Sequence, residues 1–139
     1  MKQALHTLKL KSRGRGLTEF TSDVARWVEA QGIGTGLLTL FCRHTSASLL
    51  IQENADPDVQ RDLEAYFARI APEASGRYVH DTEGPDDMPA HLRTALTGVQ
   101  LSIPVEHGRL MLGTWQGVYL FEHRRAPHER EVVLHLIGA

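Results

Sequence analysis

Cysteine is nearly absent from this chain. Cys42 is the only one among 139 residues, so no disulfide can form within the chain. A single thiol is typical of proteins kept in a reducing compartment, and we expect the cytoplasm. Long apolar runs are also lacking, since none approaches the roughly 20 residues of a membrane span. The first eleven residues have no apolar segment of the kind found in signal peptides. These absences predict a protein that does not enter membranes.

An excess of charge of one sign is lacking as well. The chain has 15 basic and 17 acidic residues, a formal net charge of -2, which argues against nucleic acid as a partner. Glycine-rich phosphate loops are missing, because Gly32 to Gly36 leads into a predicted strand and no G-x-x-x-x-G-K-[ST] motif occurs. A hydrophobic content of 42% is normal for a globular protein. The length predicts one domain over residues 1–139.

Stretches with the pattern of strands outnumber those with the pattern of helices. Helical spacing is confined to three stretches, and residues 73–87 read as a long loop. We expect an α+β fold built on antiparallel, sandwich-like sheets with a few short helices. Residues 34–41 form a continuous apolar run, which predicts a strand buried on both faces. The predicted helices cover 22–31, the stretch from Asp56 to Pro72, and 89–96; the strands cover 4–11, 34–41, 47–53, 99–105, 109–113, 116–123 and 130–137.

Three of the eight histidines lie where chemistry is plausible. His44 follows the apolar strand, His80 lies in the long loop, and His91 lies in the first turn of the last helix. Imidazole is the commonest metal ligand in proteins and titrates near neutrality. Three histidines from different elements can converge on one metal and leave a position open for water or substrate. No named zinc signature is present, so hydrogen-bonded structural histidines remain the alternative.

Two further regions carry chemically useful side chains. Asp56 before Pro57 is a helix N-cap, which is a sufficient structural role. Glu53 is in line with apolar neighbours, so it is either at the solvent edge or a desolvated acid–base group. Residues 113–117 either form a tight turn whose tryptophan fills the core or offer a small-molecule pocket. Cys42, in a buried strand, is expected to be an inert packing residue.

The order of several sequence blocks resembles the YjbQ family along nearly the whole chain. The first block runs from Phe41-Cys42-Arg43-His44-Thr45-Ser46-Ala47 through Ile51-Gln52-Glu53-Asn54-Ala55-Asp56-Pro57. The others are Tyr78-Val79-His80, Pro89-Ala90-His91-Leu92 and Leu112-Gly113-Thr114-Trp115-Gln116, followed by Glu122 and Arg130. One departure is Asp86-Asp87-Met88-Pro89, where the family often has an asparagine.

The resemblance implies a compact α+β protein with sandwich-like sheets that assembles as a homotrimer. It implies that the motif histidines gather in a cleft, which we expect at the subunit boundary. A divalent metal such as zinc would be held there by His44, His80 and His91. The same three histidines and Glu53 would be the catalytic residues. The expected substrate-binding residues are Thr45, Ser46, Thr114, Trp115, Gln116 and Arg130.

The activity that the resemblance implies is that of a secondary thiamine-phosphate synthase. Such a transferase joins a pyrimidine diphosphate to a thiazole phosphate and releases pyrophosphate. The leaving group's negative charge needs a metal or hydrogen-bond donors, and Thr45, Ser46 and Arg130 would serve as phosphate donors. A different metal-assisted reaction on a small phosphorylated or carbonyl compound fits the same residues. The alternative is a non-catalytic trimer that binds a small phosphorylated metabolite.

Overall fold

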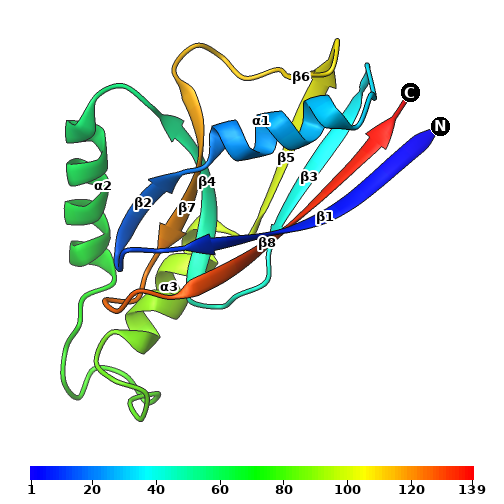
Figure 1. Cartoon of the computed structure of the whole chain (residues 1–139). Coiled ribbons are helices and arrows are strands. Elements are labelled where there is room, and N and C mark those ends of the chain that lie inside the picture. Colours follow the sequence, from blue (N-terminus) through cyan, green and yellow to red (C-terminus); the bar gives the residue numbers. More distant parts are fainter.

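Eight β-strands form two antiparallel sheets in the structure, a computed structural model that describes residues 1–139 (Figure 1). The larger sheet has five strands in the order β1-β8-β3-β5-β6, so the first and last strands of the chain are neighbours. Its strands are β1 (Lys2–Lys11), β3 (Gly36–Cys42), β5 (Gln100–Glu106), β6 (Arg109–Leu110) and β8 (Glu129–Gly138).

A smaller sheet of three strands, in the order β2-β7-β4, lies against the larger one. Its strands are β2 (Gly16–Glu19), β4 (Ala47–Glu53) and β7 (Gln116–Glu122). The central strand β7 is buried on both faces, because the ring of Phe121 on its outer face packs edge-on against Phe67 of the covering helix.

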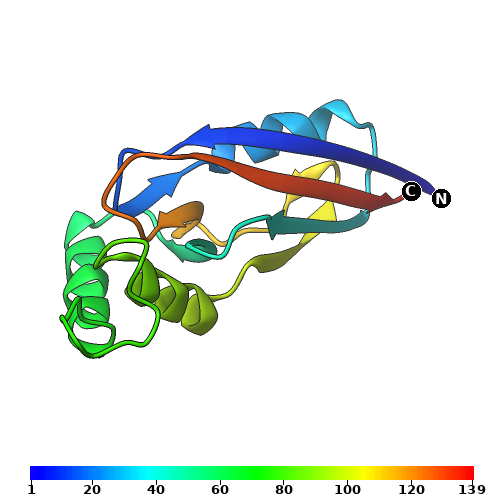
Figure 2. The ribbon, with the colours of Figure 1, turned by 90° about the horizontal axis from the view of Figure 1, so that it is seen from below.

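Three helices connect and cover the sheets: α1 (Thr21–Ala30), α2 (Pro57–Ile70) and α3 (Asp87–Thr97). Helices α2 and α3 lie at one end of the molecule, with the long loop 71–86 between them (Figure 2). Asp56 caps α2 as predicted, since its carboxylate accepts a hydrogen bond from the Asp58 amide at 2.9 Å. No helix in the structure combines the length and the apolar character that a crossing of the bilayer requires.

A single hydrophobic core joins both sheets to helix α1. It contains 16 buried residues, contributed mainly by β3, β5 and β8 of one sheet and β4 and β7 of the other. Cys42 is among them, and burial raises the pKa of its thiol, as expected for an inert packing residue. The single core and the antiparallel sheets confirm the predicted α+β fold.

Strand β3 departs from its predicted burial. Leu38 and Leu40 face the core, but Leu37 and Phe41, on the opposite face, are 44% and 47% exposed. The prediction that this apolar run is buried on both faces is therefore wrong for the single chain, in which only one face is buried. Successive side chains of a strand point to opposite faces of the sheet. Nothing in the chain covers the outer face of the five-stranded sheet here, so every second residue of β3 is left exposed or partly exposed.

Candidate metal site

Helix α3 and the loop before it bring two imidazoles to one carboxylate. Asp87 and His91 are four residues apart on α3, so their side chains lie on the same face of the helix. The loop 71–86 returns to this face and carries His80. The Nε2 atoms of His80 and His91 lie 2.7 and 3.0 Å from Oδ2 of Asp87, and the two rings are 5.5 Å apart. A His-Asp-His cluster results.

The hydrogen bonds of His91 fix the proton on its ring. Its Nδ1 lies 2.7 Å from the carbonyl oxygen of Thr45, which can only accept, so Nδ1 carries a hydrogen. In a neutral imidazole, Nε2 would then hold a lone pair that faces the carboxylate oxygen of Asp87. Two acceptors at 3.0 Å repel. The contact therefore requires positive charge between them, which either a second proton on His91 or a bound metal ion supplies.

The donor set fits a divalent metal. One atom from each of His80, Asp87 and His91 lies within 4.8 Å of the other two. Metal–ligand bonds of about 2.0 Å in a tetrahedron place neighbouring ligand atoms about 3.3 Å apart, so the contacts of Asp87 at 2.7 and 3.0 Å would lengthen slightly around an ion. A hydrogen bond from the remaining ring nitrogen to a backbone carbonyl, as His91 makes to Thr45, is the usual support of a metal-binding histidine.

Asp87 was not among the residues predicted from the sequence. The signal that could have found it is its spacing of four residues from His91, near the start of a predicted helix. The other oxygen of Asp87, Oδ1, accepts a hydrogen bond from Nη1 of Arg124 at 2.8 Å. Burial by itself would raise the pKa of Asp87, but hydrogen bonding by His80 and the charges of His91 and Arg124 outweigh it, so this pKa lies below its usual value. Asp87 is thus an ionised, buried carboxylate with one oxygen directed at the two imidazoles.

His44 stands apart from this cluster. Its Nε2 accepts a hydrogen bond from the backbone amide of Glu131 at 2.7 Å. An amide can only donate, so Nε2 holds the lone pair and the neutral ring carries its proton on Nδ1. Burial and the charge of Arg130 lower the pKa of His44, which favours this neutral form. Neither nitrogen is free for a metal, and the residue that the structure groups with His80 and His91 is Asp87 instead of His44.

Ser46 and Arg130 belong to the interior rather than to a binding surface. Arg130 donates from Nε to Oε1 of Glu122 at 2.8 Å, and from Nη2 to the hydroxyl of Ser46 at 3.0 Å. All three residues are buried, and Ser12 also donates to the Glu122 carboxylate. Arg130 and Ser46 therefore serve the packing of this end of the sheets, which corrects their prediction as phosphate donors. Thr45 contributes its carbonyl to His91.

The remaining predicted residues lie at the other end of the small sheet. Strand β4 runs for seven residues, which separates its ends by roughly 20 Å. Glu53 ends this strand, and its carboxylate accepts hydrogen bonds from the amides of Ala55 and Asp56 at 3.0 and 2.8 Å. Beside it, Gln116 hydrogen-bonds to the amide of Gly113. Within one chain, Glu53, Thr114, Trp115 and Gln116 are thus remote from the His-Asp-His cluster. Trp115 is 63% exposed and does not fill the core.

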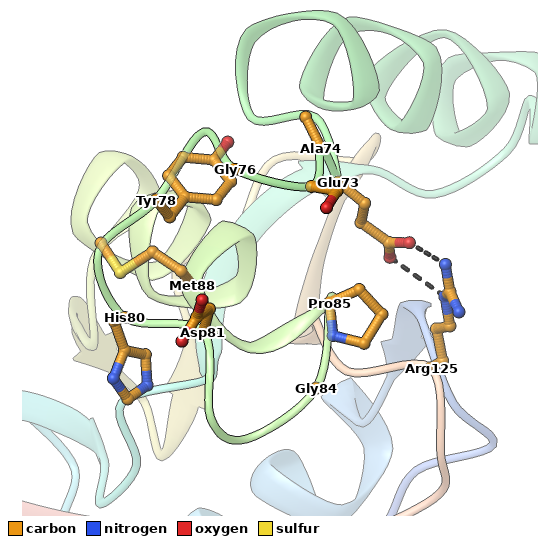
Figure 3. Close-up of a pocket in the computed structure, with 11 residues that line it drawn as sticks. Glu73, Ala74, Gly76, Tyr78, His80, Asp81, Gly84, Pro85, Met88 and Arg125 are labelled. Atoms are coloured by element: carbon orange, nitrogen blue, oxygen red, sulfur yellow. Dashed lines mark hydrogen bonds and ion pairs between the residues drawn. The ribbon is translucent and has the colours of Figure 1, made fainter.

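Two hollows adjoin the cluster. A groove of about 720 Å³ includes His44, His91, Phe41 and Val99 in its walls. A pocket of about 410 Å³ lies inside the long loop and has His80 at its rim (Figure 3). The groove therefore has a neutral imidazole and a candidate metal ligand among its lining residues.

The fold and the site together define a small α+β protein with a His-Asp-His cluster at a helix start. A family model described as UPF0047 protein YjbQ-like matches residues 6–139. The chain belongs to this family.

Sequence relatives support the assignment over nearly the full length. The UPF0047 protein sll1880 of Synechocystis is 54% identical over 137 residues, which cover 99% of this chain and 93% of the relative. The YjbQ protein of Escherichia coli O157:H7 is 41% identical, with 95% and 96% covered.

Solved structures agree in fold. A YjbQ/UPF0047 family protein from Clostridium acetobutylicum has a TM-score of 0.83 at 36% identity and covers 96% of this chain and 99% of its own. A YbjQ-like protein of unknown function from Sulfolobus solfataricus P2 has a TM-score of 0.87 at 23% identity, with 99% and 100% covered, and so supports the fold alone.

Proposed function

We propose that this protein is a metal-dependent enzyme that acts on a small phosphorylated substrate. The observation that carries the proposal is the cluster of His80, Asp87 and His91, whose three donor atoms lie within 4.8 Å of one another. Three protein ligands leave a fourth metal position open, which is the arrangement of catalytic rather than structural sites. Zinc suits two imidazoles and a carboxylate. The single buried cysteine is consistent with action in the cytoplasm.

The reaction we propose is a condensation of the kind catalysed by secondary thiamine-phosphate synthases, as the YjbQ resemblance implies. The thiazole nitrogen would form a bond to the pyrimidine methylene carbon while the bond from that carbon to the diphosphate oxygen breaks. A bound divalent ion would supply positive charge for the departing pyrophosphate. The activity would then be a transferase activity, and it need not be the main role of the protein.

His44 has a defined part in this proposal. Its Nδ1–H is the hydrogen-bond donor that its tautomer leaves available, and the side chain lines the groove that also contains His91. A neutral imidazole that carries its proton on Nδ1 can donate a hydrogen bond to a developing negative charge. We therefore assign His44 to the substrate rather than to the metal.

One observation favours the alternative, a non-catalytic protein that binds a phosphorylated metabolite. Glu53, the predicted acid–base group, caps backbone amides far from the cluster within the chain. The carboxylate that is present, Asp87, is held at Oδ1 by Arg124 and contacts both imidazoles through Oδ2. A site with no free general base suits binding as well as transfer.

Metal analysis of purified variants tests the ligand set. Wild-type protein loaded with Zn²⁺ and dialysed should retain about one ion per chain, as three ligands predict. Asp87→Asn and His91→Ala should weaken retention on the order of 100-fold, because each removes or weakens a ligand. His44→Ala should keep the ion and lose pyrophosphate release from the two thiamine precursors.

His107→Asn is the matched control, since His107 is exposed in the turn after β5 and asparagine tolerates its positive φ of 52°. Loss of zinc from His44→Ala would contradict the ligand set. Retained zinc without turnover, together with a rise in melting temperature on adding phosphate compounds, would favour the binding protein.

We also propose that the chain assembles as a homotrimer, the state that the YjbQ resemblance implies. The uncovered outer face of the five-stranded sheet supports this proposal. Leu37 pairs directly with Ile137 in the sheet, and Phe41 lies on the same face four residues along β3. Leu5 of β1 adds to this face and is 71% exposed. Aliphatic and aromatic side chains gathered on one sheet face are typical of a protein interface.

Leu37→Glu should dissociate the trimer, because the interface would have to bury an unpaired carboxylate. Light scattering after gel filtration should give about three times the 15.5 kDa chain mass for the wild type and the chain mass for the variant. Tyr66→Glu on α2, where the native side chain is 49% exposed, should leave the mass unchanged. A wild-type protein with the mass of one chain would contradict the assembly.

A further inference from the structure

The loop that carries His80 has no secondary structure of its own to hold it in place. Residues 71–86 lie between α2 and α3 and contain neither helix nor strand. A ligand on such a segment is loose unless surrounding residues fix the backbone and the neighbouring ligands. Within the loop, the Tyr78 hydroxyl donates a hydrogen bond to the Pro72 carbonyl, six residues earlier, at 2.7 Å.

Arg124, in the connection between β7 and β8, binds the end of this loop. Its guanidinium donates from Nε to Oδ2 of Asp86 at 2.9 Å and from Nη1 to Oδ1 of Asp87 at 2.8 Å. Nη2 donates to the carbonyl of Glu83 at 3.1 Å. Three nitrogens of one planar group therefore hold two side chains and the backbone of the loop.

The contact with Asp87 also decides which oxygen faces the imidazoles. Because Arg124 holds Oδ1, Oδ2 is directed at the Nε2 atoms of His80 and His91. Asp87 is 2% exposed, so in the folded protein its Oδ1 depends on the guanidinium rather than on bulk water for a hydrogen-bond donor. Arg124 thus acts on the cluster through Asp87, without touching either histidine.

The next residue, Arg125, contacts both ends of the loop. The backbone amide of Arg125 donates to Oδ2 of Asp86 at 2.9 Å. Its side chain forms an ion pair with Glu73 (Figure 3). Glu73 also pairs with Arg15. Two consecutive residues therefore hold the loop at Glu73 and at Glu83 to Asp87, on either side of His80.

We propose that Arg124 and Arg125 form a pair that closes the ligand loop, and that Arg124 is the positioning residue of the metal site. This inference rests on the proposed function for its metal-binding part. The part that concerns the order of the loop 71–86 depends only on the hydrogen bonds that Arg124 and Arg125 make to it. The planar fork of the guanidinium is essential, because a lysine ammonium at one point cannot reach all three partners.

Titration with Co²⁺, followed by its visible absorption, tests the metal-binding part. Arg124→Gln should weaken Co²⁺ affinity about 10- to 100-fold, the usual effect of losing a partner that orients a ligand. Arg124→Lys should be weakened to a similar degree. Arg125→Gln should stay within about three-fold of the wild type, since its side chain does not contact the cluster. Arg26→Gln is the matched control, because Arg26 makes an exposed ion pair on α1.

Hydrogen exchange of the metal-free protein, read by mass spectrometry, tests the loop-ordering part. Arg124→Gln should speed exchange at residues 79–87, and Arg125→Gln at residues 73–78. Wild-type affinity in Arg124→Lys would overturn the role of the fork, since charge alone would then suffice. Absence of Co²⁺ binding by the wild type would overturn the metal site and the positioning role together. Unchanged exchange in both variants would overturn the loop closure.

Discussion

Glu122→Gln should destabilise the protein by about 3–5 kcal/mol, the usual result of removing one member of a buried ion pair. Glu122 is fully buried, and its carboxylate accepts hydrogen bonds from Ser12, from Arg130 and from the amides of His123 and Arg124. Burial would raise the pKa of Glu122, but hydrogen bonds from Arg130 and Ser12 outweigh it and the pKa is lowered. The amide nitrogen of glutamine cannot accept these bonds, and Arg130 would remain as a buried cation without a counter-charge.

Urea unfolding followed by tryptophan fluorescence measures the effect, and Glu131→Gln is its control. Glu131 pairs with Arg43 at 2.7 Å, but both side chains are solvent-exposed in part. Exposed pairs contribute about 0–1 kcal/mol, so the control should change little. Equal losses in the two variants would mean that the buried network has no special weight in stability.

The sequence was a good guide to the elements of this fold. The capping carboxylate of Asp56 and the proline after it correctly predicted the start of α2, because both act within one turn of the helix. The apolar run at 34–41 correctly predicted a strand but not its surroundings. Apolar residues on both faces of a strand are buried either by the same chain or by another one, and periodicity is the same in both cases.

The site was less predictable because the contacts that fix His44 and the ring of His91 join residues far apart in the sequence. His80 and His91 were singled out by residue type, and the structure brings both to Asp87. The tautomer of His44 depends on the amide of Glu131, which is 87 residues away. No local pattern reports such a contact. Arg130 was predicted to bind phosphate, but it is buried and pairs with Glu122 of β7, a contact that exists only once the strands have packed.

His123 should make the protein sensitive to mild acid. The side chain is fully buried, and burial, with the nearby charges of Arg93, Arg130 and Arg15 opposed by Glu122, lowers its pKa to about 3. The unfolded chain protonates this histidine below about pH 6.5, whereas the folded chain does not. Between about pH 6.5 and 3 the unfolded state therefore binds more protons, so stability rises with pH across this window and falls on acidification.

The expected loss from His123 is about 2 kcal/mol between pH 7.5 and 5. Urea unfolding at both pH values, at one protein concentration, measures it in the wild type. His123→Gln keeps a polar group near Ser48, whose hydroxyl lies 2.8 Å from Nε2 in the native protein, but it cannot titrate. The variant should be less stable near neutrality and should lose about 2 kcal/mol less than the wild type on acidification. An identical loss in both proteins would show that folded His123 takes up its proton as readily as the unfolded chain, which its burial beside three arginines contradicts.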